Sequence, residues 1–249
     1  MSKIQNAFAS GKAFIPFITC GDPDLDTTAK LVRAMAEAGA DLIQLGIPFS
    51  DPTAEGPVVQ DANLRALSAG TTTDKIFSML QELRKDVSVP LVLMGYANVV
   101  FSYGTERFLS ACAQAGVDGL ILPDVPYEEK EEFAPLCRQY GLDLISIVSH
   151  TSGDRAAMIA KEAEGFVYLL ADPQDVESAC DIAALIRDNA QVPCVVGADA
   201  LTVEQVSALA RCADGVAVAA AVVELLAQHR QEALPHVDAY VRERKQAIG

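Results

Sequence analysis

Residues 41–60 read DLIQLGIPFSDPTAEGPVVQ, and this stretch decides the fold. A short apolar run within residues 42–45 ends at Gly46, and a loop rich in proline, glycine and acidic residues follows. Short apolar runs that end at glycine and proline are typical of buried strands. Asp51 and Glu55 place two carboxylates four residues apart in this loop. In a parallel α/β protein the exit of a strand is where chemistry takes place, so we expect a functional site here.

The same pattern of helix, glycine turn and apolar strand recurs along the chain. It reads AEAGADLIQL at 36–45, AQAGVDGLIL at 113–122 and RQYGLDLISI at 138–147. The glycine suits the end of a helix, and the apolar run suits a parallel strand buried on both faces. The pattern predicts eight strands, near residues 14–19, 41–45, 90–95, 118–122, 143–148, 165–170, 193–197 and 214–218.

Eight alternating units without a linker predict one domain over residues 1–249, a (β/α)8 TIM barrel with a short extra helix near residues 3–10. Thr202 is expected to cap a helix over 203–212. The alternative is a doubly wound sheet, which would carry a glycine-rich fingerprint after its first strand. Residues 20–23, CGDP, are not such a fingerprint.

Composition limits the functions that the chain can have. A net charge of −15 argues against binding to nucleic acid, because a basic surface is missing. The most apolar segment, Val216–Val223, is too short to span a membrane, and the N-terminus has no long apolar core, so we expect a cytoplasmic protein. None of the six cysteines forms a C-x-x-C pair or a zinc-like spacing, so no metal site and six free thiols in a reducing compartment are expected.

The opening stretch also resembles a known family. QLGIPFSDP at 44–52 and AEGP at 54–57 are similar to the signature of the tryptophan synthase alpha chain, in which ELGIPFSDP runs on to ADGP. The frame matches, and the resemblance covers essentially the whole chain. The two departures fall on the two catalytic carboxylates of the family: Gln44 replaces its glutamate, and Glu55 replaces its aspartate.

The resemblance implies a retro-aldol cleavage of indole-3-glycerol phosphate to indole and glyceraldehyde 3-phosphate, without a cofactor. General acid–base help from a carboxylate is typically worth about 10²–10⁴-fold. Gln44 does not titrate near neutral pH, and Glu55 reaches one methylene further than aspartate. The alternative interpretations are a buried, satisfied amide for Gln44 and a solvated loop acid for Glu55. The expected site residues are Glu55, Gln44 and Tyr168 as the catalytic set, with Phe17, Tyr96 and Asp124 lining or supporting the pocket.

The two phosphate-binding loops of the family are altered here. The family pattern GFGIS after strand seven is replaced by Gly197, Ala198, Asp199 and the two residues that follow. A carboxylate at the second glycine position repels phosphate. After strand eight, Ala219 and Ala220 replace a glycine and a serine. The flexible family lid after strand six is also missing, because a helix is expected to begin at Asp172–Pro173.

The loops that contact the beta chain in the family match the family pattern more closely than the phosphate-binding loops do. The matching positions are Pro48, Asp51, Asn98, Phe101 and Pro126, although these residues could equally shape their own loops. Three functions follow: an alpha-type partner of a beta chain with little or no catalysis, a slow lyase that relies on Glu55, or a barrel that acts on another, non-phosphorylated small molecule. The altered loops, lid and Gln44 favour the first.

Overall fold

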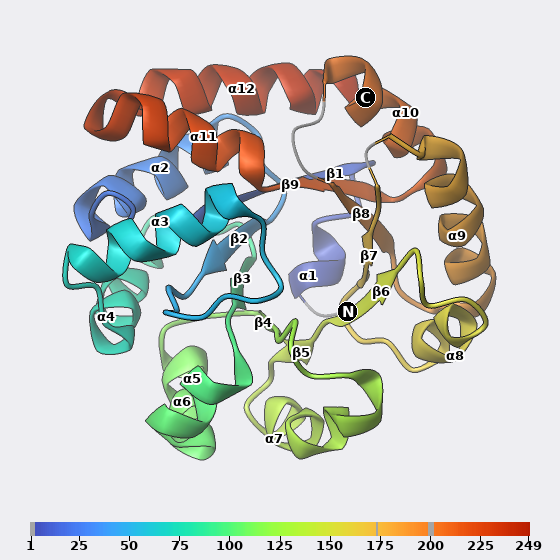
Figure 1. The fold of residues 1–249 in the computed structure, drawn as a ribbon, viewed down its shortest axis with the longest axis horizontal. Coiled ribbons are helices and arrows are strands. Elements are labelled where there is room, and N and C mark those ends of the chain that lie inside the picture. Colours follow the sequence, from blue (N-terminus) through green and yellow to red (C-terminus); the bar gives the residue numbers. More distant parts are fainter. Residues whose placement is uncertain (1–2, 173, 199–201) are drawn as a thin grey trace.

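Parallel strands form the wall of a barrel, and helices cover its outside, in the computed structural model of the chain (Figure 1). The structure describes residues 3–172, 174–198 and 202–249. The strands within these ranges are β1 Ala13–Thr19, β2 Ile43–Gly46, β3 Leu91–Met94, β4 Gly119–Ile121, β5 Asp143–Leu144, β6 Ser146–Ser149, β7 Val167–Leu170, β8 Cys194–Ala198 and β9 Gly215–Val218. They follow the order β5-β4-β3-β2-β1-β9-β8-β7-β6, and every described pair is parallel.

The barrel closes through a broken strand. β5 and β6 stand at opposite ends of the sheet order, yet they are consecutive halves of one strand interrupted at Ile145. β4 pairs with β5, and β6 pairs with β7. No pairing joins β4 to β6 among the described strands. The predicted (β/α)8 barrel is therefore confirmed, with its fifth strand split in two.

The helices follow the strands around the ring. They are α1 Lys3–Asn6, α2 Leu25–Glu37, α3 Pro57–Ser68, α4 Thr73–Leu83, α5 Ala97–Tyr103, α6 Thr105–Gln114, η1 Tyr127–Glu132, α7 Ala134–Gln139, α8 Arg155–Lys161, α9 Val176–Asn189, α10 Val203–Cys212, α11 Ala220–His229, η2 Arg230–Glu232 and α12 Leu234–Ala247. The expected N-terminal helix is confirmed but shorter. Thr202 caps α10 as predicted, in a reciprocal capping box with Gln205.

One helix start was predicted wrongly. The helix after β7 begins at Val176, and not at Asp172–Pro173. The Asp175 side chain accepts a hydrogen bond from the Ser178 backbone N–H at 3.0 Å, which satisfies an otherwise unpaired donor of the first turn. Pro173 itself lies outside the described residues.

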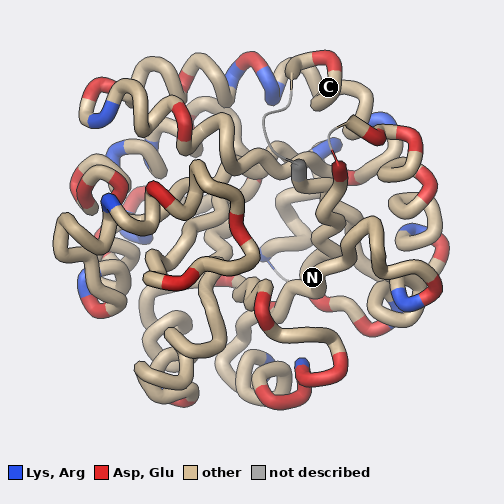
Figure 2. Tube along the Cα trace, viewed as in Figure 1, with Lys and Arg blue, Asp and Glu red and all other residues tan. Residues whose placement is uncertain are grey.

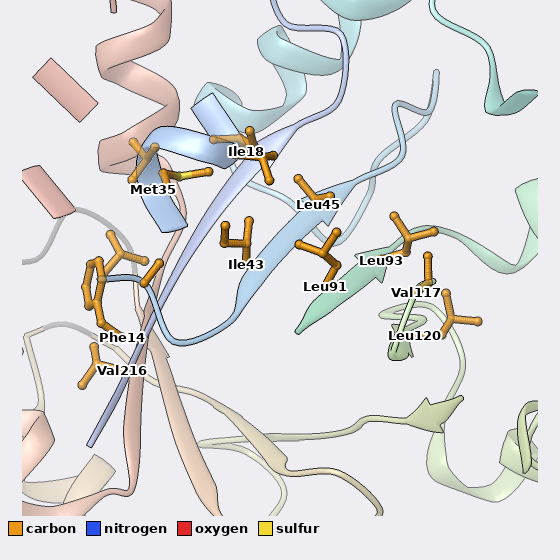
Figure 3. Close-up of a cluster of buried hydrophobic side chains, with 14 of the residues drawn as sticks. Phe14, Ile18, Met35, Ile43, Leu45, Leu91, Leu93, Val117, Leu120 and Val216 are labelled. Atoms are coloured by element: carbon orange, nitrogen blue, oxygen red, sulfur yellow. The ribbon is translucent and has the colours of Figure 1, made fainter. Parts of the chain in front are cut away.

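Two hydrophobic layers hold the barrel together. Ile15, Leu42 and Ile121 belong to a cluster inside the barrel, which Ile4 of α1 joins. The outer layer lies between strands and helices, and it includes Phe14, Ile18, Met35, Leu45 and Leu120 (Figure 3). Neighbouring residues of a strand alternate between the two layers because successive side chains point to opposite faces.

Charged residues lie mainly on the surrounding helices and loops (Figure 2). Asp143 is the only charged residue within the nine described strands. No helix of the described residues is long and apolar enough to cross a membrane.

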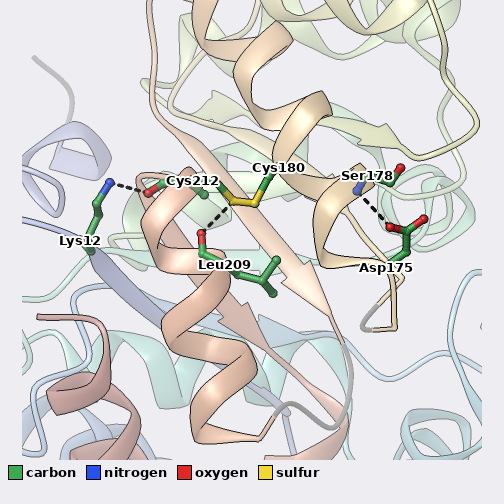
Figure 4. The surroundings of a disulfide bond; sticks show 7 residues. Lys12, Asp175, Ser178, Cys180, Leu209 and Cys212 are labelled. Carbon is green, nitrogen blue, oxygen red and sulfur yellow. Dashed lines mark hydrogen bonds between the residues drawn. A yellow bond between two sulfur atoms is a disulfide. The ribbon is translucent and has the colours of Figure 1, made fainter.

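The expectation of six free thiols is wrong for two cysteines. Cys180 of α9 and Cys212 of α10 form a disulfide, with Cα atoms 5.3 Å apart (Figure 4). α9 and α10 pack side by side in the ring, which brings together two cysteines 32 residues apart. Cys20, Cys112, Cys137 and Cys194 are buried free thiols, as expected.

Candidate active site

The loop between β2 and α3 carries the candidate acid–base residue. β2 ends at Gly46, and α3 begins at Pro57 with Gly56 as its N-cap. Proline suits the first helical position, because its fixed φ matches the helix and no N–H is lost there. Glu55 comes immediately before Gly56, so the start of α3 fixes its position. It lies in the loop that follows the carboxyl end of β2.

Glu55 is partly buried and held by two side chains. Asn63 Nδ2 donates to Glu55 Oε2 at 3.1 Å, and the carboxyl also shares a hydrogen bond with Tyr96. Burial raises the pKa of the Glu55 carboxyl from 4.5 to about 7, and these two hydrogen bonds oppose that rise. A carboxyl with a pKa near the working pH is suited to give or take a proton. The solvated loop acid is therefore not what the structure contains.

Asn63 is a site residue that the sequence analysis missed. It is buried in α3, where Nδ2 also donates to the Val59 carbonyl at 2.7 Å and Oδ1 accepts from the Phe49 backbone N–H at 2.8 Å. It thus ties both ends of the loop to the helix. A signal was present: Val59, Ala62, Asn63 and Ala66 occupy one buried stripe of α3, and a polar residue in such a stripe needs partners.

Tyr96 completes the surroundings of the carboxyl. It is buried at the start of α5, its ring stacks on Phe49 with centroids 5.1 Å apart, and its hydroxyl accepts from the Ala54 backbone N–H at 3.1 Å. Asp124 is exposed and accepts from the Ala97 backbone N–H at 3.0 and 3.1 Å. Asp124 therefore holds the first turn of α5, and through it Tyr96.

Gln44 is a buried amide inside the barrel. Gln44 lies in β2, two residues after Leu42 of the interior cluster. Because side chains alternate along a strand, the Gln44 side chain points inward as well. Only 2% of the residue is exposed, and Nε2 donates to Met94 Sδ at 3.0 Å. At this position the site has a hydrogen-bonding group that does not ionise near neutral pH.

Two aromatic residues pack on glycines at the strand ends. Phe17 lies against Gly46, where an added Cβ would come within 2.6 Å of the Phe17 ring. Tyr168 covers Gly197, where an added Cβ would lie 2.4 Å from the Tyr168 hydroxyl. Both aromatic residues are buried. These close approaches explain why the two strands carry glycine where they do.

The two predicted phosphate loops are only partly described. Gly197 and Ala198 end β8, whereas Asp199 lies outside the described residues. Ala219 precedes α11 without a side-chain cap, and the buried Ala220 is the first residue of that helix. The residues on the α11 side therefore provide no hydroxyl.

The predicted interface residues differ in exposure. Asp51, Asn98 and Pro126 are exposed, and Phe101 is 46% exposed while its ring packs on Phe133 with centroids 5.3 Å apart. Pro48 is buried within its own chain, so it shapes the loop instead of presenting a surface. Four of the five positions are thus accessible to a partner.

The site can provide one titratable carboxyl, one buried amide and aromatic walls. Within the described ranges, no three His, Cys, Asp or Glu side chains gather in a way that could hold a metal ion. This combination fits proton transfer at an apolar substrate.

Comparison with known proteins gives one consistent result. The family model described as tryptophan synthase alpha chain matches residues 4–248. A tryptophan synthase alpha chain of Lacticaseibacillus casei is 41% identical, over 100% of this chain and 96% of that protein. The crystal structure of the alpha subunit of Legionella pneumophila tryptophan synthase superposes with a TM-score of 0.93 at 31% identity, covering 100% of this chain and 98% of the other. A chain of the Pyrococcus furiosus tryptophan synthase complex gives a TM-score of 0.89 at 32% identity, covering 95% and 99%.

Proposed function

Because the chain belongs to the tryptophan synthase alpha chain family, we propose that it works in tryptophan biosynthesis as an alpha-type partner of a beta chain. In this proposal it has little or no activity in the cleavage of indole-3-glycerol phosphate. The assembly of a relative in a tryptophan synthase complex and the exposure of Asp51, Asn98, Phe101 and Pro126 support the partner role. We also propose a cytoplasmic location, because the family works in amino-acid biosynthesis.

The observation that carries the proposal is the buried amide of Gln44. The cleavage requires a proton to reach the indole carbon and another to leave the side-chain hydroxyl. Gln44 stands inside the barrel, hydrogen-bonded to Met94, where the family resemblance places a carboxylate. An amide can orient a substrate, but it cannot transfer a proton at neutral pH. Loss of one positioned acid–base group typically costs about 10²–10⁴-fold in rate.

The phosphate end of the site supports the same conclusion. A backbone phosphate site needs glycine for close approach, or a hydroxyl to donate a hydrogen bond. Ala219 and Ala220 provide neither. Weaker binding of the phosphate would add to the loss of the proton-transferring carboxylate, because remote binding energy helps to position the reacting atoms.

One observation favours a second candidate, a slow lyase. Glu55 has its pKa raised to about 7 and is fixed by Asn63 and Tyr96, which is the state expected of a general acid–base group. In this case Glu55 carries both proton transfers alone.

Indole release from indole-3-glycerol phosphate tests the two candidates. The purified chain is assayed alone and with a beta chain, beside the matched variant Glu55→Gln, which keeps the size of the side chain and removes the acid. The partner role is measured separately, as the change that the chain causes in turnover of serine and indole by the beta chain.

The proposal predicts altered beta-chain turnover and indole release near background in every sample. Release well above background that disappears in Glu55→Gln would establish the slow lyase instead. Failure to change beta-chain turnover at saturating concentrations would refute the partner role, whatever the lyase assay gives.

A further inference from the structure

A cavity of about 250 Å³ lies in and behind the barrel wall, where the fifth strand is broken. It is lined by residues around the end of β4, by both halves of the broken strand and by η1, α7 and α8. The candidate site residues Phe17, Gln44, Glu55, Tyr96, Asp124 and Tyr168 do not line it. The cavity is therefore separate from these pocket residues, although Pro126, one of the predicted interface positions, also lines it.

The origin of the cavity is the missing strand pairing. On the side away from β3, β4 pairs only with the two residues of β5, and Ile145 makes the last backbone hydrogen bond on this side, from its N–H to the Leu120 carbonyl at 2.9 Å. Beyond that point β6 pairs with β7 alone among the described strands. The outer cover is slight, because α7 has only six residues and η1 is a 3-10 helix. The wall therefore opens between β4 and β6.

The cavity has an apolar body and a polar rim. Its apolar lining includes Leu122, Leu144, Ile147 and Ile159, and Ser146, the first residue of β6, adds a hydroxyl. In the described part of the chain, the Ser146 hydroxyl has no hydrogen-bond partner. A concave apolar surface with a few polar groups at one end is the usual form of a small-molecule site.

Three cations and two carboxylates stand in the lining, so its formal charge is +1 in a chain of net charge −15. The cations come from three separate elements: Lys130 from η1, Arg138 from α7 and Arg155 from α8. The carboxylates are Glu162 and Glu164.

The exposure of these ion pairs decides which ligand charge is accepted. The Lys130 side chain is 19% exposed and its ammonium contacts Glu162 at 2.6 Å, but the Glu162 side chain is 58% exposed. Arg155 pairs with Glu128, which is 56% exposed. An anionic ligand can take the place of either glutamate, because both carboxylates are more than half exposed and can turn into water, although Glu162 then also gives up the hydrogen bond that it accepts from the Tyr127 hydroxyl at 2.7 Å. A cationic ligand would instead pair with Glu162. The mostly buried Lys130 ammonium would then lose its carboxylate partner, which costs free energy.

We propose that this cavity is a second ligand site, which binds a small amphipathic carboxylate with its apolar body between β4 and β6 and its carboxylate on Lys130 and Arg155. Ile145 and Ile147 line the cavity and also belong to the interior cluster that contains Tyr168. A bound ligand thus lies behind the wall of the candidate active site. The inference does not depend on whether the chain cleaves indole-3-glycerol phosphate.

Titration with 2-naphthoate, followed by amide chemical shifts, tests the proposal. 2-Naphthamide is the matched neutral probe on the unaltered protein. Lys130→Met removes the ammonium, and Ala134→Phe places a ring in the cavity. Lys85→Met is the control variant, because Lys85 forms an exposed pair with Glu82 on α4, away from the cavity.

We expect 2-naphthoate to shift the amides of Ser146 and Ile147, and to bind at least about tenfold more tightly than 2-naphthamide. Lys130→Met should weaken naphthoate binding by about tenfold or more, and Lys85→Met should leave it unchanged. Equal binding of the two probes, no binding at millimolar concentration, or shifts centred on Gln44 and Tyr96 would each overturn the proposal. The comparison of the two probes remains decisive even if a variant fails to fold.

Discussion

Replacing Glu55 with glutamine should change how the stability of the protein depends on pH. A carboxyl whose pKa is 4.5 in the unfolded chain and about 7 in the folded chain binds its proton more tightly when folded. Its contribution to stability is therefore complete below pH 4.5 and is lost as the pH rises through 7. The loss amounts to on the order of 3 kcal/mol.

Glu55→Gln keeps the oxygen that accepts from Asn63 and removes the ionisation. We therefore expect the variant to match the natural protein at about pH 4.5 and to be more stable by about 3 kcal/mol at about pH 8. Urea unfolding across this range measures the difference. Glu82→Gln is the control, because the Glu82 side chain is 69% exposed and pairs with Lys85, just beyond the end of α4.

Parallel stability profiles for Glu55→Gln and the natural protein would refute the reasoning. They would mean that water reaches the carboxyl in the folded state, and that burial does not raise its pKa. The role of Glu55 as an acid–base group poised near neutral pH would then lose its physical basis.

Three further predictions concern other parts of the molecule. Gln44→Glu alone should raise indole release far less than a working acid–base group would, and a gain of about 100-fold in that assay would contradict the weight given to the altered phosphate loops. Asn63→Leu should cost about 2 kcal/mol in urea unfolding, because it leaves the Phe49 backbone N–H without its partner, and should raise the pKa of Glu55 in a carbon-13 titration; an unchanged pKa would count against the hydrogen bond. Replacing Cys180 and Cys212 with serine should lower stability by roughly 3–4 kcal/mol without reductant, and equal unfolding midpoints of the two proteins would count against the disulfide.

The barrel could be predicted from the sequence because strands buried on both faces leave continuous apolar runs. The run ending at Gly46 and the helix capped by Thr202 are local signals, and both were found. The break at Ile145 was not predicted, because Leu144, Ile147 and Val148 surround it with an apolar run like that of an intact strand, although Asp143 and Ser146 on its two sides are polar. Whether a strand keeps its neighbour depends on what covers it, and the short α7 is not visible in the local pattern.

The candidate site could be predicted only in part, because some of its properties depend on contacts between elements that are far apart in the sequence. The position of Glu55 follows from the motif, but its raised pKa depends on Tyr96 and Asn63, which reach it from other elements. The disulfide depends on the rotation of α9 against α10, which no spacing between Cys180 and Cys212 reveals. Pro48 matched an interface position, yet it is buried within its own chain, and burial depends on the path of the loop in space, which the motif does not reveal.

The broken fifth strand also gives the ring a seam. In an evenly closed barrel each pair of neighbouring strands shares a similar number of backbone hydrogen bonds, so no pair separates more easily than the others. Here β4 and β6 are joined only through the short β5, and parting them breaks the fewest backbone bonds of any boundary in the described wall. Slow opening of the native fold should therefore begin at this seam, and the amides of Ser146–Ser149 should exchange with solvent earlier than those of β1, which is paired on both sides.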